Sequence, residues 1–134
     1  MKILEAVKQR FESSLFDIRA LVQSDLFENE LDAAEGLNKN GYQRAAGAMA
    51  GVVLEAHLHT VCENHKIGIP KYWVISKFND LLKDADTIDI PTWRFIQRLG
   101  DLRNLCDHKK SSDPTVVDIK ELIDGTRKIT KTVF

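Results

Sequence analysis

Arg103 and His108 are the side chains of this chain whose types and spacing suggest chemistry. An imidazole titrates near neutral pH, so it can take the proton from a ribose 2′-hydroxyl. A guanidinium can stabilise the negative charge that forms when that oxygen attacks the neighbouring phosphorus. This cleavage needs no metal ion. The same two cations can instead neutralise the C-terminal end of a helix, which is a common structural role.

The helix that carries the pair decides whether the two groups can meet. The segment from about Pro91 to His108 is predicted to be helical, because Pro91 suits the first helical position. Its apolar residues recur every three or four positions: Trp93, Ile96, Leu99, Leu102 and Cys106. On a continuous helix, Arg103 and His108 would lie about 140° apart. The polar run after His108 predicts that the helix ends there, so the imidazole would swing from the terminal turn.

Helical spacing dominates the rest of the chain, and no stretch alternates as a strand would. Six helices are predicted, over about residues 2–23, 26–37, 42–64, 73–82, 91–108 and from 114 to the terminus. Ser24-Asp25 is interpreted as a helix end followed by a new cap, and Asp113-Pro114 as the cap of the last helix. The sequence therefore predicts a single all-α domain over residues 1–134, a compact up-and-down bundle of five to six helices.

The third of these helices contains an unusual run of small residues. Gly47 and Gly51 lie four positions apart within it and therefore share a face. A glycine inside a helix costs about 1 kcal/mol relative to alanine, so a close contact is expected to offset that cost. We expect another helix to pack tightly against this face.

Composition limits the function classes. The chain has 134 residues, of which 43% are hydrophobic and 29% charged, and its formal net charge is −1. This balance is typical of a globular domain and argues against a protein that coats nucleic acid along its whole surface. Two widely spaced cysteines favour a reducing compartment. The start has no signal-peptide pattern and no apolar run approaches about 18 residues, so a soluble, cytoplasmic protein is expected.

The segment Arg103-Asn104-Leu105-Cys106-Asp107-His108 resembles the signature of the HEPN superfamily, an arginine and a histidine separated by four to six residues. The order of the surrounding helices is also similar over about residues 40–134. The resemblance implies a helical bundle that often forms a homodimer, with the motifs of two copies lining one cleft. Many members are metal-independent ribonucleases of toxin–antitoxin or defence systems, and some are neutralised by a small nucleotidyltransferase. Others lack the motif and act as interaction modules for a protein or a nucleotide.

The resemblance also implies roles for individual residues. Arg103 would contact phosphate, His108 would transfer protons, and Asn104 would orient one of them or the scissile phosphate. Glu55 would be a supporting polar residue. No cofactor is implied.

A basic concentration surrounds the motif. Arg94 and Arg98 lie one to two turns before it, and Lys109 and Lys110 follow it directly. If these side chains border the cleft, they form a track for RNA phosphates. Otherwise they form an exposed charged face, which is the commoner fate of such runs.

Three other patterns leave alternatives open. Glu55, His59 and Glu63 share a helix face and would suit a metal, or form a solvated stripe of side-chain pairs. Two Cys/His pairs, Cys62 with His65 and Cys106 with His108, would suit zinc, although buried packing is the usual role of a free cysteine. Trp73 and Trp93 would stack on bases or cover the core. We predict no metal site.

Overall fold

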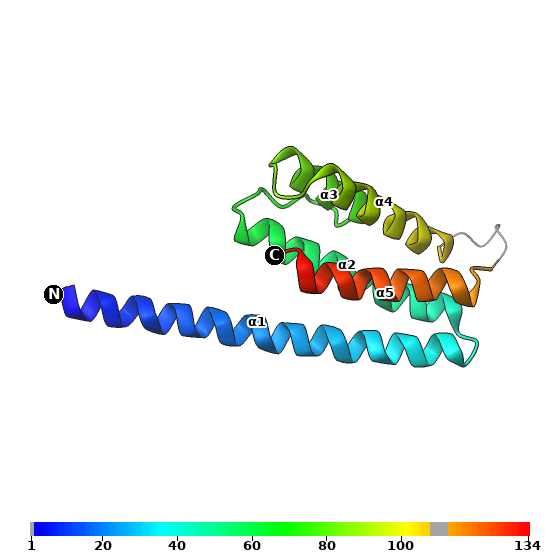
Figure 1. Cartoon of the computed structure of the whole chain (residues 1–134), viewed down its shortest axis with the longest axis horizontal. Coiled ribbons are helices and arrows are strands. Elements are labelled where there is room, and N and C mark those ends of the chain that lie inside the picture. The colour runs from blue at the N-terminus through cyan, green and yellow to red at the C-terminus, as the bar shows by residue number, and fades with distance from the viewer. Residues whose placement is uncertain (1, 108–112) are drawn as a thin grey trace.

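The computed structural model describes residues 2–107 and 113–134 (Figure 1). They form five helices and contain no strand: α1 (Lys2–Lys39), α2 (Gln43–Asn64), α3 (Ile75–Asp84), α4 (Ile90–Leu105) and α5 (Val116–Thr132). The predicted all-α helical bundle is confirmed. The helices run up and down except that α3 repeats the direction of α2, because the loop between them crosses back (Figure 1).

Helix α1 is one continuous helix where the sequence predicted two. The break expected at Ser24-Asp25 is absent, because both residues are exposed within a helix. Each costs only a fraction of a kcal/mol there relative to alanine, and no glycine or proline forces the chain to turn. The second half of α1 packs inward through Phe27, Leu31 and Ala34, whereas Leu26 is 56% exposed.

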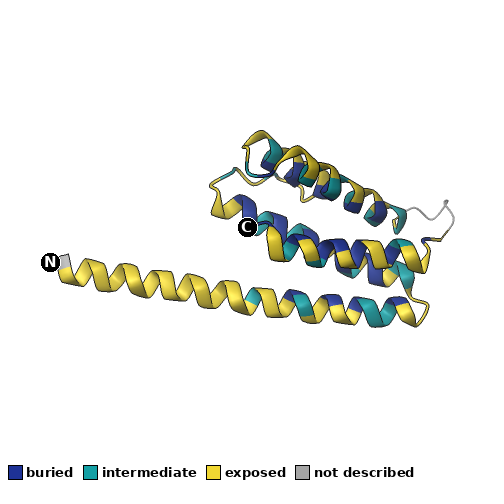
Figure 2. Cartoon of the chain, viewed as in Figure 1, coloured by how far each residue is buried: buried dark blue, intermediate teal, exposed yellow. Residues whose placement is uncertain are grey.

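The first half of α1 projects beyond the bundle (Figure 1). Every residue from 3 to 22 is exposed, and Figure 2 shows this half of the helix in one colour. Apolar residues recur there every three or four positions and form a stripe, but this stripe does not contribute to the core of its own bundle.

Helix α2 occupies the centre of the fold and contacts all four other helices. Its core side chains include Val53, Leu54, Leu58 and Val61, and its predicted range of 42–64 is confirmed. By mean hydropathy and length, α2 is the one helix among the described residues that meets the criterion for a membrane span, although the sequence count found no such run. Of its apolar window, 56% is buried inside the bundle. The core helix of a soluble protein has the same properties.

The helix ends explain how the motif is positioned. Asp89 caps α4 by accepting a hydrogen bond from the Thr92 backbone N–H at 2.8 Å, and Pro91 lies in the first turn as predicted. Helix α4 ends at Leu105, three residues before the predicted end. Helix α3 begins two residues later than predicted, at Ile75.

The cap of α5 also differs from the prediction. Thr115, and not Asp113, caps this helix in a capping box with Asp118, in which each side chain accepts from the other's backbone N–H. Pro114 therefore precedes the cap instead of opening the helix.

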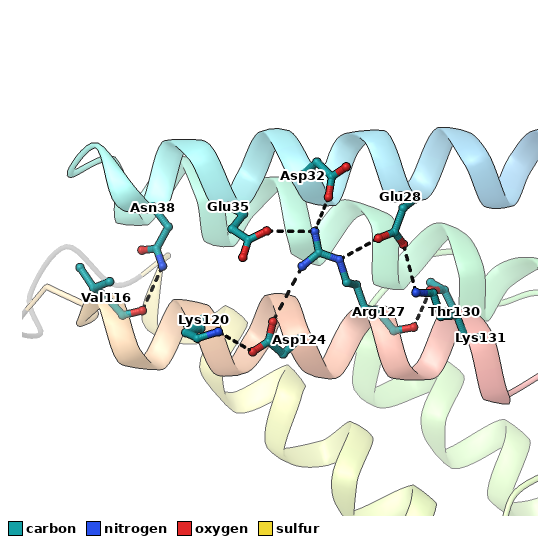
Figure 3. A network of polar contacts seen from close by, with 10 residues as sticks. All are labelled: Glu28, Asp32, Glu35, Asn38, Val116, Lys120, Asp124, Arg127, Thr130 and Lys131. Carbon is teal, nitrogen blue, oxygen red and sulfur yellow. Dashed lines mark hydrogen bonds and ion pairs between the residues drawn. The ribbon is translucent and has the colours of Figure 1, made fainter.

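Arg127 of α5 joins that helix to α1 (Figure 3). Its guanidinium lies 3.0 Å from Glu28, 2.5 Å from Asp32 and 3.2 Å from Glu35, which project from successive turns of α1. Asp124 lies 3.8 Å away on α5 itself. One guanidinium thus pairs with four carboxylates, and three of these pairs fix the second half of α1 against α5.

His57 predicts a pH dependence of stability. Its ring is buried against the carbonyl of Val133, 2.7 Å from Nε2, and burial lowers the pKa of the imidazole while that hydrogen bond opposes the change. The unfolded chain therefore binds the proton more readily than the folded chain. The contribution of His57 to the free energy of unfolding is fully present above about pH 6.5 and is lost as the pH drops below that value. Thermal melts between pH 7.5 and 5 should show this fall. His57→Gln should flatten it, whereas the exposed His65→Gln should not.

Candidate functional site

Arg103 lies in the last turn of α4, directly against the glycine face of α2. A Cβ added to Gly51 would lie 2.6 Å from Cγ and 2.8 Å from Nε of Arg103. One turn earlier, a Cβ on Gly47 would lie 2.2 Å from the sulfur of Cys106. The close helix approach predicted from Gly47 and Gly51 is confirmed, and it brings the motif arginine onto the α2 backbone.

Two carboxylates hold the guanidinium of Arg103. Its Nη1 is hydrogen-bonded to Asp107, and its Nε lies 3.8 Å from Oε1 of Glu55. Because 3.8 Å is too long for a hydrogen bond, the buried Nε has no hydrogen-bond partner among the described residues. Burial raises the pKa of the Glu55 carboxyl, Arg103 opposes that rise and Asp107 adds to it.

These side chains line a pocket of about 220 Å³ between α2, α4 and the start of α3. Asn104 also lines it, so Arg103, Asn104 and Glu55, which the family resemblance singled out, lie around one pocket. Its other walls come from α3, from the loop before it and from α4: Trp73, Val74, Ile75, Ser76, Gln97, Gly100, Asp101 and Asp107. With one arginine against three carboxylates, the described part of the pocket is acidic.

Trp73 forms an aromatic wall of this pocket. It precedes α3, is 48% exposed, and stacks on His59 with ring centroids 4.0 Å apart. His59 in turn pairs with Glu63 at 2.8 Å. Trp93 lies elsewhere, with its Nε1 donating to Asp80 at 2.9 Å. Of the two tryptophans considered for base stacking, only Trp73 lines the pocket.

Arg44 is a residue that the sequence analysis missed. It donates from Nη1 to the carbonyl of Cys106 at 2.8 Å, and from Nη2 to Asp113 at 2.8 Å. It therefore ties the end of α4 to the approach to α5, on either side of the segment 108–112. An arginine in the first turn of a helix gives no local signal of this role, because its partners lie more than 60 positions away.

The remaining predicted site residues divide into two groups. His108, Lys109 and Lys110 lie outside the described residues. Arg94 and Arg98 are exposed on α4 but do not line the pocket, and Arg98 pairs with Glu121 of α5 at 3.1 Å. Arg94 and Arg98 therefore do not extend a track of phosphate-binding side chains into the pocket.

The metal alternatives find no support in the described residues. No group of three or more His, Cys, Asp or Glu side chains there is arranged to hold a metal ion. In the predicted row on α2, Glu55 approaches Arg103 while His59 pairs with Glu63. Cys62 is buried in the core.

No protein-family model, curated protein or solved structure matches this chain. The HEPN resemblance therefore rests on the motif and the helix order alone.

The contact at Gly47 predicts a specific loss of stability. Gly47→Ala places a methyl group 2.2 Å from the Cys106 sulfur and 3.0 Å from Cδ1 of Ile119, so the free energy of unfolding should fall by about 1–2 kcal/mol. Gly36→Ala is the control, because nothing lies within 4 Å of its added Cβ and helix propensity should raise stability. Chemical denaturation measures both. The double variant Gly47→Ala/Cys106→Ala should recover part of the lost free energy of unfolding. If it does not, the proposed clash with the Cys106 sulfur is wrong.

Proposed function

We propose that the pocket at Arg103 is the active site of a metal-independent endoribonuclease, a HEPN-type toxin or defence component. The observation that carries the proposal is the convergence of Arg103, Asn104 and Glu55, from two helices, in one open pocket. Asp107 lines the same pocket, and His108 is the next residue in the chain. The proposed base thus follows directly from a residue on the pocket wall.

The proposed reaction is an internal transesterification. The base takes the proton from the ribose 2′-hydroxyl, the 2′-oxygen bonds to phosphorus, and the bond from phosphorus to the 5′-oxygen breaks. The 5′-oxygen takes up a proton as it leaves. The products are a 2′,3′-cyclic phosphate and a 5′-hydroxyl. In this scheme His108 transfers the protons, and Arg103 stabilises the charge on the phosphate oxygens.

The acidic surroundings of Arg103 require an exchange of partners. Phosphate must replace Asp107 on the guanidinium, and Asp107 is half-exposed and four residues away on the same chain segment. Such pairs contribute only about 0.3–0.5 kcal/mol, so the exchange costs little. Asn104 lines the same wall and would orient the phosphate.

The decisive experiment is cleavage of a structured RNA by the purified chain in excess EDTA. We expect cleavage in single-stranded loops, because a pocket of this size can admit an unpaired nucleotide but not a duplex. Products should carry 2′,3′-cyclic phosphate and 5′-hydroxyl ends. Direct phosphorylation of the 5′ end by a kinase, a 3′ end blocked to ligation, and mass spectrometry identify them. An absence of cleavage across a panel of RNAs, for protein shown to be folded, would refute the proposal.

A non-catalytic interaction module is the second candidate. It is favoured by the pairing of Arg103 with Glu55 and Asp107, which would make the arginine a structural link between α2 and the end of α4. In that case Arg103→Ala lowers the melting temperature and there is no activity to lose. A nucleotidyltransferase-type antitoxin or another protein partner would then be sought by co-purification from the native host.

A further inference from the structure

The first half of α1 carries an apolar stripe that its own bundle leaves uncovered. We define the α1 stripe as Leu4, Val7, Phe11, Leu15, Ile18 and Val22. Their exposed fractions run from 37% at Leu15 to 74% at Leu4. At 100° per residue, these six side chains fall within an arc of about 80°. The segment is a coherent apolar face about 30 Å long, and it projects into solvent (Figure 2).

The α1 stripe does not point toward the bundle that follows it. The inward face of α1, marked by Phe27, Leu31 and Ala34, lies about 160° around the helix from the centre of the stripe. A partner on the stripe would therefore lie on the outer side of α1 and would not collide with α2 or α5. A projecting helix of this length is marginal in water by itself, so the stripe needs a covering surface.

We infer that a second copy of this chain covers the stripe, through an antiparallel pair of α1 helices. A two-fold contact requires a patch that is complementary to itself. Read from either end, the stripe has almost the same spacing, with steps of three, four, four, three and four residues. In the reversed register Leu4 lies opposite the partner's Val22, and Phe11 opposite the partner's Leu15.

The charges on one flank fit this arrangement. In an antiparallel pair, equal flanks of the two helices meet, which brings Arg10 near the partner's Asp17, and symmetry forms this contact twice. On the other flank Arg19 lies near both Glu5 and Lys8 of the partner, and Glu12 lies near the partner's Glu12, so that flank does not favour the pair. From residue 3 to residue 22 there are three acidic and three basic side chains. This balance does not favour an anionic lipid surface, which selects a basic polar face.

The area is also sufficient for a stable dimer. Fully burying one aliphatic or aromatic side chain removes roughly 60–120 Å² of apolar surface from water. With Ile3 and Leu21 at its edges, the stripe then offers roughly 290–580 Å² per copy. A standard interface buries about 800 Å² per partner, slightly more than half of it apolar.

This dimer leaves the pocket at Arg103 open in both copies. Among the described residues α1 contacts α2 and α5, but it contacts neither α3 nor α4, which supply most of the pocket lining. The contact thus differs from a dimer in which two motifs share a cleft. It does not rest on the proposed ribonuclease activity.

Sedimentation equilibrium of the full chain tests the inference. We expect a mass of about twice 15.2 kDa at micromolar concentration. The variant Val7→Glu/Phe11→Glu/Ile18→Glu should weaken association at least about 100-fold. The matched control is Ala6→Glu/Gln9→Glu/Ser13→Glu, which adds the same charge to the other side of α1 and should remain dimeric. Circular dichroism should show that the helical bundle is folded in both variants, since residues 3–22 lie outside the core.

Spin labels test the direction of the helices. Labels at Asn29→Cys, in a Cys106→Ala background, should lie about 48 Å apart along the axis in the antiparallel pair. In a parallel pair they would lie about 10 Å apart. A short distance overturns the antiparallel register. Three results overturn the inference of a dimer. They are a monomeric parent chain, a stripe variant that stays dimeric, and a monomer that binds phosphatidylcholine or phosphatidylserine vesicles through the stripe.

Discussion

His108→Ala is expected to lower the rate of RNA cleavage by about 10²–10⁴-fold, because a positioned base contributes a factor of that size. Binding of RNA should change much less, since the imidazole acts on a proton. Single-turnover cleavage in EDTA separates the two effects. The control is His65→Ala, whose exposed ring contacts the carbonyl of Phe134 away from the pocket. Equal cleavage by His108→Ala and the parent chain would exclude the mechanism.

The partners of Arg103 sharpen this test. Arg103→Lys keeps the charge but loses the planar fork, so it should lose most of the activity if phosphate binds there. Asp107→Asn removes the competing carboxylate and should maintain or increase RNA affinity. In a purely structural site, Asp107→Asn would only lower stability. The two variants therefore distinguish a phosphate site from a helix link by opposite effects on binding.

Arg127→Ala is expected to lower the free energy of unfolding by about 2–4 kcal/mol. The reason is that it leaves Asp32 and Glu35 of α1 without a cation and leaves Glu28 with only Lys131, at 3.7 Å. The guanidinium is 18% exposed, so the loss should be smaller than for a fully buried pair. Urea denaturation at pH 7 measures it.

Lys120→Ala is the matched control for Arg127→Ala. Lys120 forms an ordinary exposed pair with Asp124 at 3.1 Å on the same helix, so its removal should cost no more than about 0.5 kcal/mol. Arg127→Lys should recover only part of the loss, because one ammonium cannot reach three carboxylates in the geometry of Figure 3. Equal losses of stability in Lys120→Ala and Arg127→Ala would show that the Arg127 cluster stabilises the fold no more than one exposed ion pair does.

The sequence by itself determined the helical class, most helix boundaries and the close approach at Gly47 and Gly51. These features depend on interactions a few residues apart or on steric size, which a linear pattern records. That Arg103, Asn104 and Glu55 line one pocket is known only from the structure, since the separation of Glu55 from the other two carries no local signal. Their proposed roles come from the family resemblance.

Only the tertiary structure decided what the polar residues contact. Arg44 and Arg127 form their main contacts with residues more than 60 positions away, and no spacing rule predicts such partners. The prediction of a helix break at Ser24-Asp25 was also wrong. Cap-forming residues are tolerated on an exposed helix face, and that exposure is a property of the tertiary structure. Whether an apolar stripe is core or interface is likewise decided by what packs on it. The stripe on α1 has a helical pattern in the sequence, but its exposure appears only once the bundle is built.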